Sequence, residues 1–548
     1  MKNLKTGLLL GCSLILGGCL ETDEDSFSNQ RGIVCSPEQI DMAIQTVASD
    51  YTSSAVAIGC SEGGFLDGNL IKEGSDYTVS AGSERLYHIG RNYIDTVAQY
   101  DFLLTDIENW SYSANDADES TSNPYKLIEV SDTKAYLIRY NKSKVWIVNP
   151  SALNAEDFKI DRCKDLNNQD WKTYIPAKDE VLIGGLVFLN DWEIRSEISN
   201  ALGKIFIKNI NTNKEEEVEF TDEKVIVPGV SLIQRARNTN QVYLGYSSPK
   251  TQARTYLYNL KTKDKKLVKE QEIPSGHNPE DYIVERLECK SHDGRMVPIT
   301  ITRHKKTKID GSANLLLYGY GSYGNSISPS FSSTRLSLIN RDIIWVTAHI
   351  RGGMERGMKW WKEGKLLNKK NTFEDYIAVA KYLIEKKYTS KGKIIGLGGS
   401  AGGLLMGAVV NKAPELFLGI IMAVPFVDSL TTNLDHSLPL TLGEFDEFGN
   451  AKANKEHFDY IYSYAPYHNI KKMDYPHILI TTSLSDNRVL FDEPAKFTAK
   501  LRDYKTDNNL LLLKTEMSAG HGGKSGRDGA IEEIALDYSF ALKITGKI

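Results

Sequence analysis

The pattern of hydrophobic and polar residues differs between the two halves of the chain. Between about residues 50 and 290, apolar and polar residues alternate over short runs that end in polar turns. Examples of these runs are residues 135–140, 144–148 and 254–259. Period-two alternation between turn residues predicts antiparallel hairpins. Because the theme recurs, as at 204–208, we expect small sheets arranged as a β-propeller over residues 46–290.

After about residue 295 the rhythm changes. Short apolar runs at 314–318, 343–346 and 392–395 alternate with longer amphipathic stretches such as 372–387. That stretch has a polar cap at Asn371 or Thr372 and acidic residues in its first turn, as the helix dipole favours. Strand and helix in alternation predict a doubly wound, mostly parallel sheet over residues 291–548, with helices on both faces.

Composition adds limits on the possible partners. The 548 residues carry a net charge of −5, and we therefore expect no nucleic acid among the partners. No group of His, Cys and Asp has the spacing of metal ligands, and neither a metal nor a cofactor is expected.

The N-terminus resembles a bacterial lipoprotein signal. Lys2 and Lys5 precede a short apolar run at 8–16, and small residues lead into Cys19. The resemblance implies a signal peptide over 1–18, lipidation of Cys19 and an acidic, serine-rich tether over 19–45. Since Leu20 replaces the aspartate that retains some lipoproteins in the inner membrane, we expect an anchor in the cell envelope, at the outer membrane rather than the inner. An ordinary signal peptide with a chance cysteine is the alternative.

The other cysteines carry little information. Cys12 would leave with the signal peptide. An oxidising compartment allows a bridge between Cys35 and Cys60 without requiring it. Isolated Cys163 and Cys289 are most simply buried small hydrophobic residues.

The strongest chemical motif is Gly398-x-Ser400-x-Gly402, between an apolar strand and a helix. A serine hydroxyl becomes a nucleophile when a sharp turn lifts it toward a base and toward backbone N–H groups. The same segment also fits a dinucleotide-binding loop, with Asp428 as the later acid, or a plain tight turn.

Two later loops supply partners for the serine. Asp486 follows the apolar run 477–482, and His521 lies in a glycine-rich loop after the run 509–514. The order Ser, Asp, His at successive strand ends is the order of an α/β-hydrolase triad. A dinucleotide loop predicts no such histidine, and we therefore expect Ser400 to attack, His521 to carry the proton and Asp486 to orient the imidazole.

These motifs carry a family resemblance. Over about residues 165–548 the chain resembles oligopeptidase B (protease II), a branch of the prolyl oligopeptidase family. The segments that carry the likeness are 318–324, 351–353, 398–403, 425–428, 443–450, 493–496 and 520–527. The resemblance implies a serine endopeptidase for short peptides, in which a propeller covers an α/β-hydrolase domain.

The resemblance also assigns roles near the triad. Tyr320 matches the tyrosine that completes the oxyanion hole with the N–H of Ala401. A phenol suits that role because it donates a hydrogen bond while neutral. Tyr323 matches an aromatic wall of the substrate pocket, although its pattern also fits a core residue. Arg488 matches an arginine that binds a substrate carbonyl or carboxylate.

The resemblance also implies a preference for basic residues in the substrate. Glu444 and Asp446 match the cluster that binds an arginine or lysine side chain in oligopeptidase B, and the alternative is a solvated acidic loop. Relatives that prefer paired basic residues carry aspartates in the loop after the tyrosine motif. Here residues 326–331 contain only serine, isoleucine, proline and phenylalanine. We therefore expect cleavage after single basic residues.

Upstream the resemblance changes. Residues 123–151 resemble a propeller-type surface lipoprotein, which suggests an incomplete or hybrid propeller with a fusion junction near 160–170. Two functions stay open. One is a lipid-anchored serine peptidase acting on short peptides. The other is a surface propeller with a binding or structural role and an inactive or unregulated hydrolase appendage.

Overall fold

The computed structural model describes the chain from residue 42 onward, with gaps. The described residues are 42–47, 53–59, 70–73, 77–81, 85–90, 96–101, 111–113, 124–131, 134–139, 146–152, 156–162, 173–220, 223–233, 239–438 and 440–548. The predicted signal peptide, Cys19, Cys35, Cys60 and Cys163 lie outside them. Among the described helices, none has the length and apolar character to cross a membrane.

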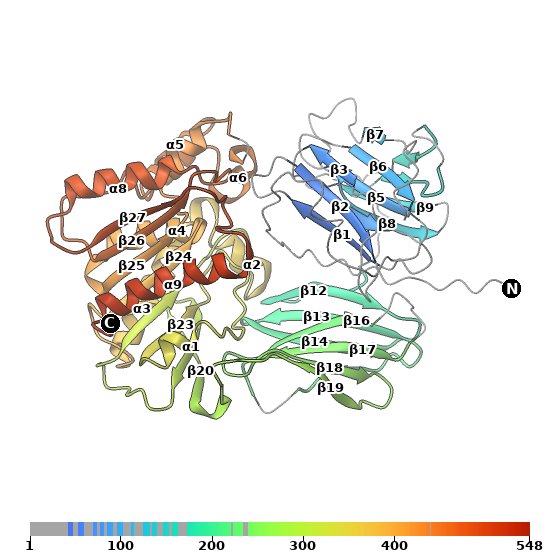
Figure 1. Ribbon diagram of the computed structural model, residues 1–548, viewed down its shortest axis with the longest axis horizontal. Coiled ribbons are helices and arrows are strands. Elements are labelled where there is room, and N and C mark those ends of the chain that lie inside the picture. Colours follow the sequence, from blue (N-terminus) through green and yellow to red (C-terminus); the bar gives the residue numbers. More distant parts are fainter. Residues whose placement is uncertain are drawn as a thin grey trace, which may run out of the picture. The chain divides into compact units, whose positions relative to one another are not determined.

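Five antiparallel sheets precede an eight-stranded sheet within the described part of the chain, and each of the five joins consecutive strands in order (Figure 1). The strands are β1 (Met42–Val47), β2 (Ser53–Gly59) and β3 (Leu70–Glu73); β4 (Tyr77–Ala81), β5 (Arg85–Gly90), β6 (Thr96–Asp101) and β7 (Ser111–Ser113); β8 (Pro124–Ser131), β9 (Lys134–Arg139), β10 (Trp146–Val148) and β11 (Lys159–Arg162); β12 (Val181–Phe188), β13 (Trp192–Ser199), β14 (Leu202–Asn209) and β15 (Glu215–Glu217); β16 (Val227–Leu232), β17 (Gln241–Ser247), β18 (Arg254–Asn259) and β19 (Lys265–Glu270). Small up-and-down sheets of this kind are typical of propeller blades.

The chain forms two compact units, Met1–Ile175 and Pro176–Ile548. In the first unit the sheets β4–β7 and β8–β11 share one core. Its members are Tyr87, Ile89, Val97, Leu127, Ala135, Leu137, Trp146, Val148, Ala152 and Phe158. Each sheet therefore buries its apolar side against its neighbour, as repeated blades do.

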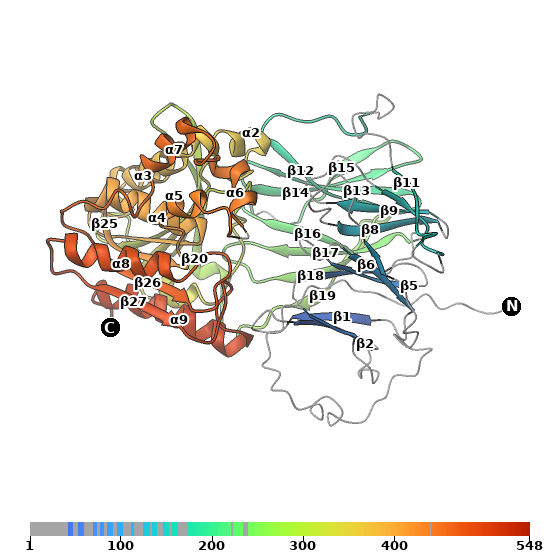
Figure 2. The ribbon, with the colours of Figure 1, turned by 90° about the horizontal axis from the view of Figure 1, so that it is seen from above.

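In the second unit the sheets β12–β15 and β16–β19 lie against each other (Figure 2). Alternation places Val242, Leu244 and Tyr246 of β17 on the buried face. They pack with Ile194 and Ile207 of the preceding sheet. The predicted hairpins at 204–208 and 254–259 thus form β14 and β18.

The same unit contains an eight-stranded sheet of order β20-β21-β23-β22-β24-β25-β26-β27. Its strands are β20 (Tyr282–Lys290), β21 (Met296–His304), β22 (Asn314–Tyr318), β23 (Ile343–Ala348), β24 (Ile394–Gly399), β25 (Phe417–Ala423), β26 (His477–Ser483) and β27 (Leu511–Glu516). The strands from β23 through β22 to β27 run parallel, and β20 and β21 pair antiparallel at one edge. The sheet begins before residue 291, where the sequence rhythm placed the domain boundary.

Helices cover both faces of this sheet (Figure 1). They are α1 (Leu336–Ile339), α2 (Gly357–Lys362), α3 (Lys370–Glu385), α4 (Ala401–Lys412), α5 (Ser429–Leu434), α6 (Thr441–Phe448), α7 (Lys455–Tyr462), α8 (Asp492–Tyr504) and α9 (Gly526–Ile544). The apolar residues of α3, α4 and α8 pack on one face, and those of α1 and α9 pack on the other. Helix α3 begins at Lys370, slightly before the predicted cap.

The hairpin turn between β13 and β14 contacts the eight-stranded part of the second unit. Asn200 and Ala201, between β13 and β14, both have positive φ, at 51° and 61°. The N–H of Ala201 donates to the carbonyl of Glu355 at 2.8 Å, and the Asn200 amide donates to Glu288 at 2.9 Å. The blade therefore contacts the loop that follows β23.

Candidate active site

Ser400 occupies the sharp turn between β24 and α4. Its φ of 55° and ψ of −119° are rare for a residue with a side chain. Backbone bonds hold the turn: the N–H of Ser400 donates to Ala423 O at 2.8 Å, and its carbonyl accepts from Phe426 at 3.1 Å. The strained serine is thus fixed from the neighbouring strand.

The glycines of the motif are explained by contacts. A Cβ on Gly398 would lie 2.3 Å from the carbonyl oxygen of Gly402, and one on Gly403 would lie 2.4 Å from Pro425. A Cβ on Gly402 would approach the ring of Tyr320 at 3.2 Å. Positions 398 and 403 therefore exclude a side chain in this turn, and position 402 leaves little room for one.

The structure brings the three predicted catalytic side chains together. Ser400 Oγ lies 3.0 Å from His521 Nε2. His521 Nδ1 lies 2.7 Å and 2.9 Å from the two oxygens of Asp486. With the Nδ1 proton donated to the carboxylate, Nε2 is free to accept the serine proton.

The loop after β26 fixes Asp486. Its Oδ1 accepts the backbone N–H groups of Arg488 at 2.9 Å and Val489 at 3.0 Å, and the carboxylate is fully buried. Several donors to one buried carboxylate fix its position. Asp486 can therefore orient the His521 imidazole and stabilise its cation.

The predicted oxyanion donors flank the serine. Ala401 is the first residue of α4, and its N–H makes no hydrogen bond within the described chain. Tyr320 follows β22, and its ring lies against Gly402 in the turn that carries Ser400. Burial raises the pKa of Tyr320 to about 12, so its hydroxyl keeps the proton it would donate. Both groups are suited to bind a developing oxyanion.

An acidic side chain lies beside this loop. The hydroxyl of Tyr323 donates to Glu444 Oε2 at 2.8 Å, and its ring packs edge-on against Phe448. Burial, together with the nearby Glu447 carboxylate, raises the pKa of Glu444 to about 7. Asp446, the second acid predicted to bind a basic side chain, is exposed and has no ion pair in the described structure. The buried acid next to Glu444 is Glu447.

Arg488 follows Asp486 by two positions in the loop after β26. Its side chain is exposed and makes no ion pair with any described residue, although its charge acts on Tyr320 and lowers that group's pKa. The guanidinium is therefore available for a carbonyl or carboxylate acceptor.

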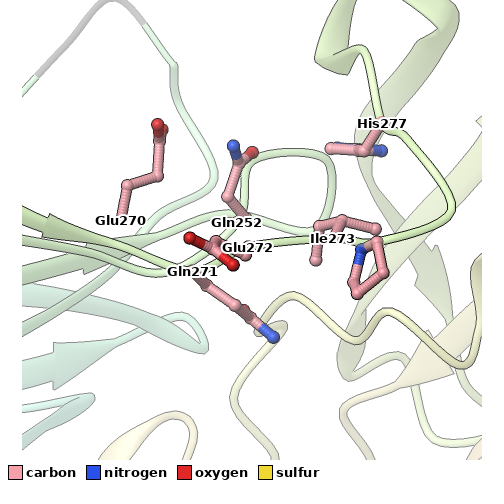
Figure 3. Close-up of a pocket in the computed structure, with 7 residues that line it drawn as sticks. Gln252, Glu270, Gln271, Glu272, Ile273 and His277 are labelled. Atoms are coloured by element: carbon pink, nitrogen blue, oxygen red, sulfur yellow. The ribbon is translucent and has the colours of Figure 1, made fainter.

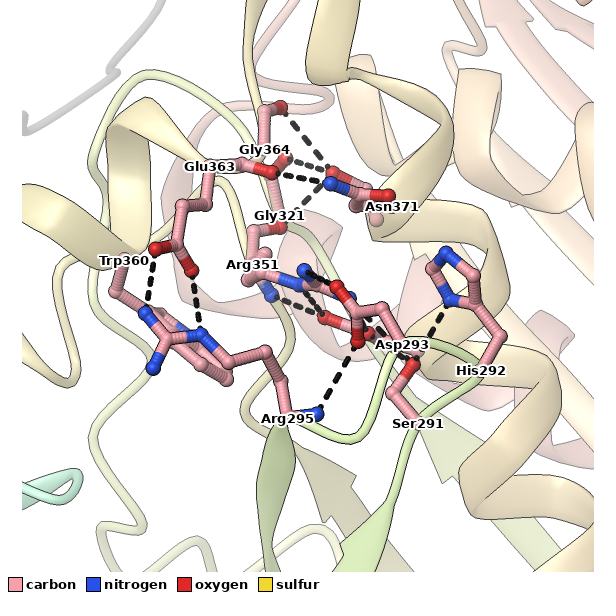
Figure 4. Close-up of polar contacts among 12 residues, drawn as sticks. Ser291, His292, Asp293, Arg295, Gly321, Arg351, Trp360, Glu363, Gly364 and Asn371 are labelled. Atoms are coloured by element: carbon pink, nitrogen blue, oxygen red, sulfur yellow. Dashed lines mark hydrogen bonds and ion pairs between the residues drawn. The ribbon is translucent and has the colours of Figure 1, made fainter.

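Buried ion pairs hold the loop behind Tyr320. Arg351, 1% exposed, pairs with Asp375 at 2.6 Å and with Asp293 at 2.5 Å (Figure 4). The next residue, Gly352, lies against the tyrosine loop, residues 320–323. A Cβ on Gly352 would lie 1.9 Å from Gly321 O. Position 352 is therefore restricted to glycine.

Two other motif segments meet behind the serine. Asp428 is buried and pairs with Lys496 at 2.6 Å, and its N–H donates to Glu493 at 2.9 Å. These contacts join the loop after β25 to the start of α8, just beyond the aspartate loop. The segments 425–428 and 493–496 therefore support the site without entering it.

A separate open hollow of about 500 Å³ lies where β19 leads toward the hydrolase sheet (Figure 3). Its lining residues are Gln252, Glu270, Gln271, Glu272, Ile273, Pro274 and His277. None of them belongs to the triad or its loops.

Comparison with known proteins agrees with this geometry. A profile described as "Prolyl oligopeptidase family" matches residues 329–547, and one described as "Prolyl oligopeptidase, N-terminal beta-propeller domain" matches residues 101–271. The chain belongs to the prolyl oligopeptidase family. Membership confirms the predicted fold class, a β-propeller domain followed by an α/β-hydrolase domain with a mostly parallel sheet. The propeller profile begins upstream of the predicted junction near 160–170, so the likeness extends further toward the N-terminus than the motifs indicated.

Individual members of the prolyl oligopeptidase family are similar in sequence and structure. The chain is 39% identical over 404 residues to dipeptidyl aminopeptidase BI of Pseudoxanthomonas mexicana, covering 73% of this chain and 55% of that protein. It is 40% identical over 412 residues to protease 2 of Moraxella lacunata, covering 73% of this chain and 57% of that protein. It thus spans little more than half the length of these curated relatives.

Two solved structures of oligopeptidase B are also similar. That from Leishmania major has a TM-score of 0.77 at 25% identity, covering 90% of this chain and 77% of that chain. That from Trypanosoma brucei, with covalently bound antipain, has a TM-score of 0.68 at 28% identity, covering 92% and 72%.

Sequence reasoning missed the residues that support the site. Lys369, Glu447, Arg351 and Asp375 are buried and paired, yet neither the Lys369–Glu447 pair nor the Arg351–Asp375 pair can be read from the local sequence. The usable signal was spacing: Glu447 follows Glu444 by three positions and so shares its helix face.

Proposed function

We propose that this chain is a serine peptidase that cleaves short peptides on the carboxyl side of arginine or lysine. The observation that carries the proposal is the contact of His521 with both Ser400 Oγ and Asp486. Family membership supports peptide hydrolysis as the reaction.

The geometry supports a two-step mechanism. Ser400 Oγ attacks the peptide carbonyl as its proton passes to His521 Nε2, and Tyr320 and the Ala401 N–H receive the negative oxygen. The imidazolium then gives its proton to the leaving amine, which departs and leaves an acyl-enzyme on Ser400. Water, activated by His521, releases the acid and regenerates the serine.

The substrate preference follows from Glu444. This carboxyl is partly buried and already accepts a phenol hydrogen bond. A cationic side chain would favour its ionised form and pair with it, whereas a neutral side chain would leave it unpaired. Arg488 is placed to bind a carbonyl or carboxylate of the same peptide. Asp446 would contribute only from its exposed position.

The mode of cleavage is proposed as internal. One relative is named a protease and another a dipeptidyl aminopeptidase, so their names differ on this point. Peptides with a blocked N-terminus distinguish the two modes, because an aminopeptidase requires a free amine. The serine-containing loop at 326–331 carries no acid, which supports cleavage after a single basic residue.

The proposed location is the bacterial cell envelope, through a lipid on Cys19 and at the outer rather than the inner membrane. The support is the signal-like N-terminus described above. Incorporation of a fatty-acid analogue by cells expressing the chain, and its loss in Cys19→Ser, tests the anchor.

A panel of blocked peptides tests the activity. Arg and Lys before the scissile bond should give hydrolysis, Glu and Pro should give little, and Ser400→Ala should abolish all of it. Arg-Arg and Gly-Arg peptides should be cleaved at similar rates. A large advantage for Arg-Arg contradicts the single-residue preference, and a folded chain that cleaves nothing favours the surface-propeller function.

A further inference from the structure

Lys369, immediately before α3, is a buried lysine outside the triad. Its side chain is 1% exposed. Its ammonium group has three oxygen acceptors: Gly321 O at 2.7 Å, Ser322 Oγ at 2.6 Å and Glu447 Oε1 at 3.1 Å. An ammonium has three N–H donors, so the group is fully satisfied. Such full pairing is expected, because a buried charge without hydrogen-bond partners is costly.

The acceptors come from two separate parts of the site. Gly321 and Ser322 lie directly between Tyr320 and Tyr323 in the tyrosine loop. Glu447 lies on α6, three positions after Glu444 and on the same helix face. Lys369 therefore ties the proposed oxyanion donor to the proposed specificity acid.

A second hydrogen bond links the loop at 320–323 to α6. Tyr323 donates to Glu444 at 2.8 Å, so the tyrosine loop and α6 meet at both ends of the helix turn. Glu447 is also held from the other side, because Trp361 Nε1 donates to its Oε2 at 2.8 Å. The Lys369–Glu447 pair is thus the buried anchor, and Tyr323–Glu444 is the contact nearer the solvent.

We propose that Lys369 is a positioning residue that sets Tyr320 and Glu444 together, so that oxyanion binding and basic-residue preference depend on one buried ammonium. The inference rests on the proposed function. It predicts that a single substitution distant from the reacting atoms lowers both reactivity and selectivity.

An electrostatic effect separates this role from a merely structural one. The groups that act on Glu444 are Tyr323 of the loop, Glu447 of its own helix and Lys369. Glu447 raises the pKa of Glu444, and Lys369 lowers it. Loss of the lysine alone should therefore move the Glu444 titration to higher pH.

The experiment uses the full chain with three readouts. These are the second-order rate of Ser400 modification by a neutral fluorophosphonate, the ratio of kcat/KM for Arg over a neutral P1 residue, and the pH midpoint of that ratio. The variants are Lys369→Met, Glu447→Gln and their combination. Lys362→Met, an exposed lysine at the end of α2, is the matched control.

Lys369→Met should slow the fluorophosphonate reaction at least about tenfold and lower the Arg preference, since small displacements of a catalytic group are costly. Its pH midpoint should rise. Adding Glu447→Gln should return the midpoint toward that of the wild type while the reaction stays slow. Glu447→Gln alone should lower the pH midpoint below that of the wild type, because the carboxylate that raises the pKa of Glu444 is gone.

Wild-type rate, ratio and midpoint in a folded Lys369→Met chain would overturn the inference while leaving the proposed function intact. A wild-type chain that reacts with no fluorophosphonate overturns both. If Lys369→Met does not fold, Ser322→Ala removes one acceptor and should slow the reaction severalfold. An unchanged rate in that variant also overturns the inference.

Discussion

The hydroxyl of Tyr323 donates a hydrogen bond to Glu444 Oε2 at 2.8 Å, and the two residues are 121 positions apart in the chain. The contact places the proposed specificity acid beside the loop that carries Tyr320. Tyr323 itself has a positive φ of 59°, an unusual conformation for an aromatic residue. Such strain is concentrated at functional sites, as it is at Ser400.

Selectivity for basic residues should depend on pH. The pKa of Glu444 is raised to about 7, so the carboxyl is mainly neutral below that pH and anionic above it. The ratio of kcat/KM for Arg over a neutral P1 residue should therefore rise from about pH 6 to about pH 8. The ratio cancels the titration of the triad, which both substrates share.

Glu444→Gln should remove this pH dependence and lower kcat/KM for Arg peptides by about 30-fold, or about 2 kcal/mol. Neutral peptides should be much less affected. Asp446→Asn is the matched control on the same helix, and its effect should be small because Asp446 is exposed. An equal loss in the two variants would show that the charge of the helix matters rather than the position of Glu444.

Tyr320→Phe should lower kcat by about 100-fold or more and leave KM nearly unchanged, because an oxyanion donor acts in the transition state. Tyr323→Phe provides the comparison. It keeps the ring and loses the bond to Glu444, so it should alter the Arg preference and spare hydrolysis of neutral peptides. Steady-state kinetics with both peptide types measures the difference, and a Tyr320→Phe enzyme of normal kcat would remove Tyr320 from the mechanism.

Gly398→Ala should prevent the serine turn from closing, since the added Cβ would lie 2.3 Å from Gly402 O. We expect a loss of about 1–3 kcal/mol of stability and loss of activity. Gly443→Ala is the control, because nothing lies within 4 Å of its added Cβ. Thermal unfolding and peptide hydrolysis of the two variants test this, and an active, stable Gly398→Ala chain would contradict the assigned contacts.

Glu355→Gln should change the pH dependence of stability. Burial raises the pKa of Glu355 from 4.5 to about 7, so its ionisation destabilises the folded chain as the pH rises through that window. The glutamine variant lacks this loss. Its stability relative to the wild type should therefore increase from pH 5 to pH 8, by about 3 kcal/mol at most. Thermal unfolding at both pH values measures it, with the exposed Glu415→Gln as control. A difference that stays constant with pH would show that Glu355 does not titrate there.

Much of the fold could be predicted because its signals are local. Alternation and turn residues located β9, β14 and β18, and apolar runs located β22, β23, β24, β26 and β27. The edge strands β20 and β21 could not be assigned, since an antiparallel hairpin has the same pattern in a blade and in the hydrolase sheet. Only its partner, β23, distinguishes the two.

The candidate site was predictable to the same degree. Ser400, Asp486 and His521 each follow a strand, and a parallel sheet gathers such loops at one edge. Lys369 gave no such signal, because its burial depends on an acid 78 positions away. For the same reason the sequence could not tell which of Asp446 and Glu447 is buried. Asp446 is exposed, and Glu447 is buried only because of contacts made by α6.

The most direct test of the account is covalent modification of Ser400. Incubation with a fluorophosphonate, followed by intact mass measurement and peptide mapping, should show one adduct per chain, on Ser400. Ser400→Ala should show none, and His521→Ala should react far more slowly because the base is missing. A folded wild-type chain without an adduct, or with the adduct on another serine, would contradict the assignment of Ser400 as the nucleophile.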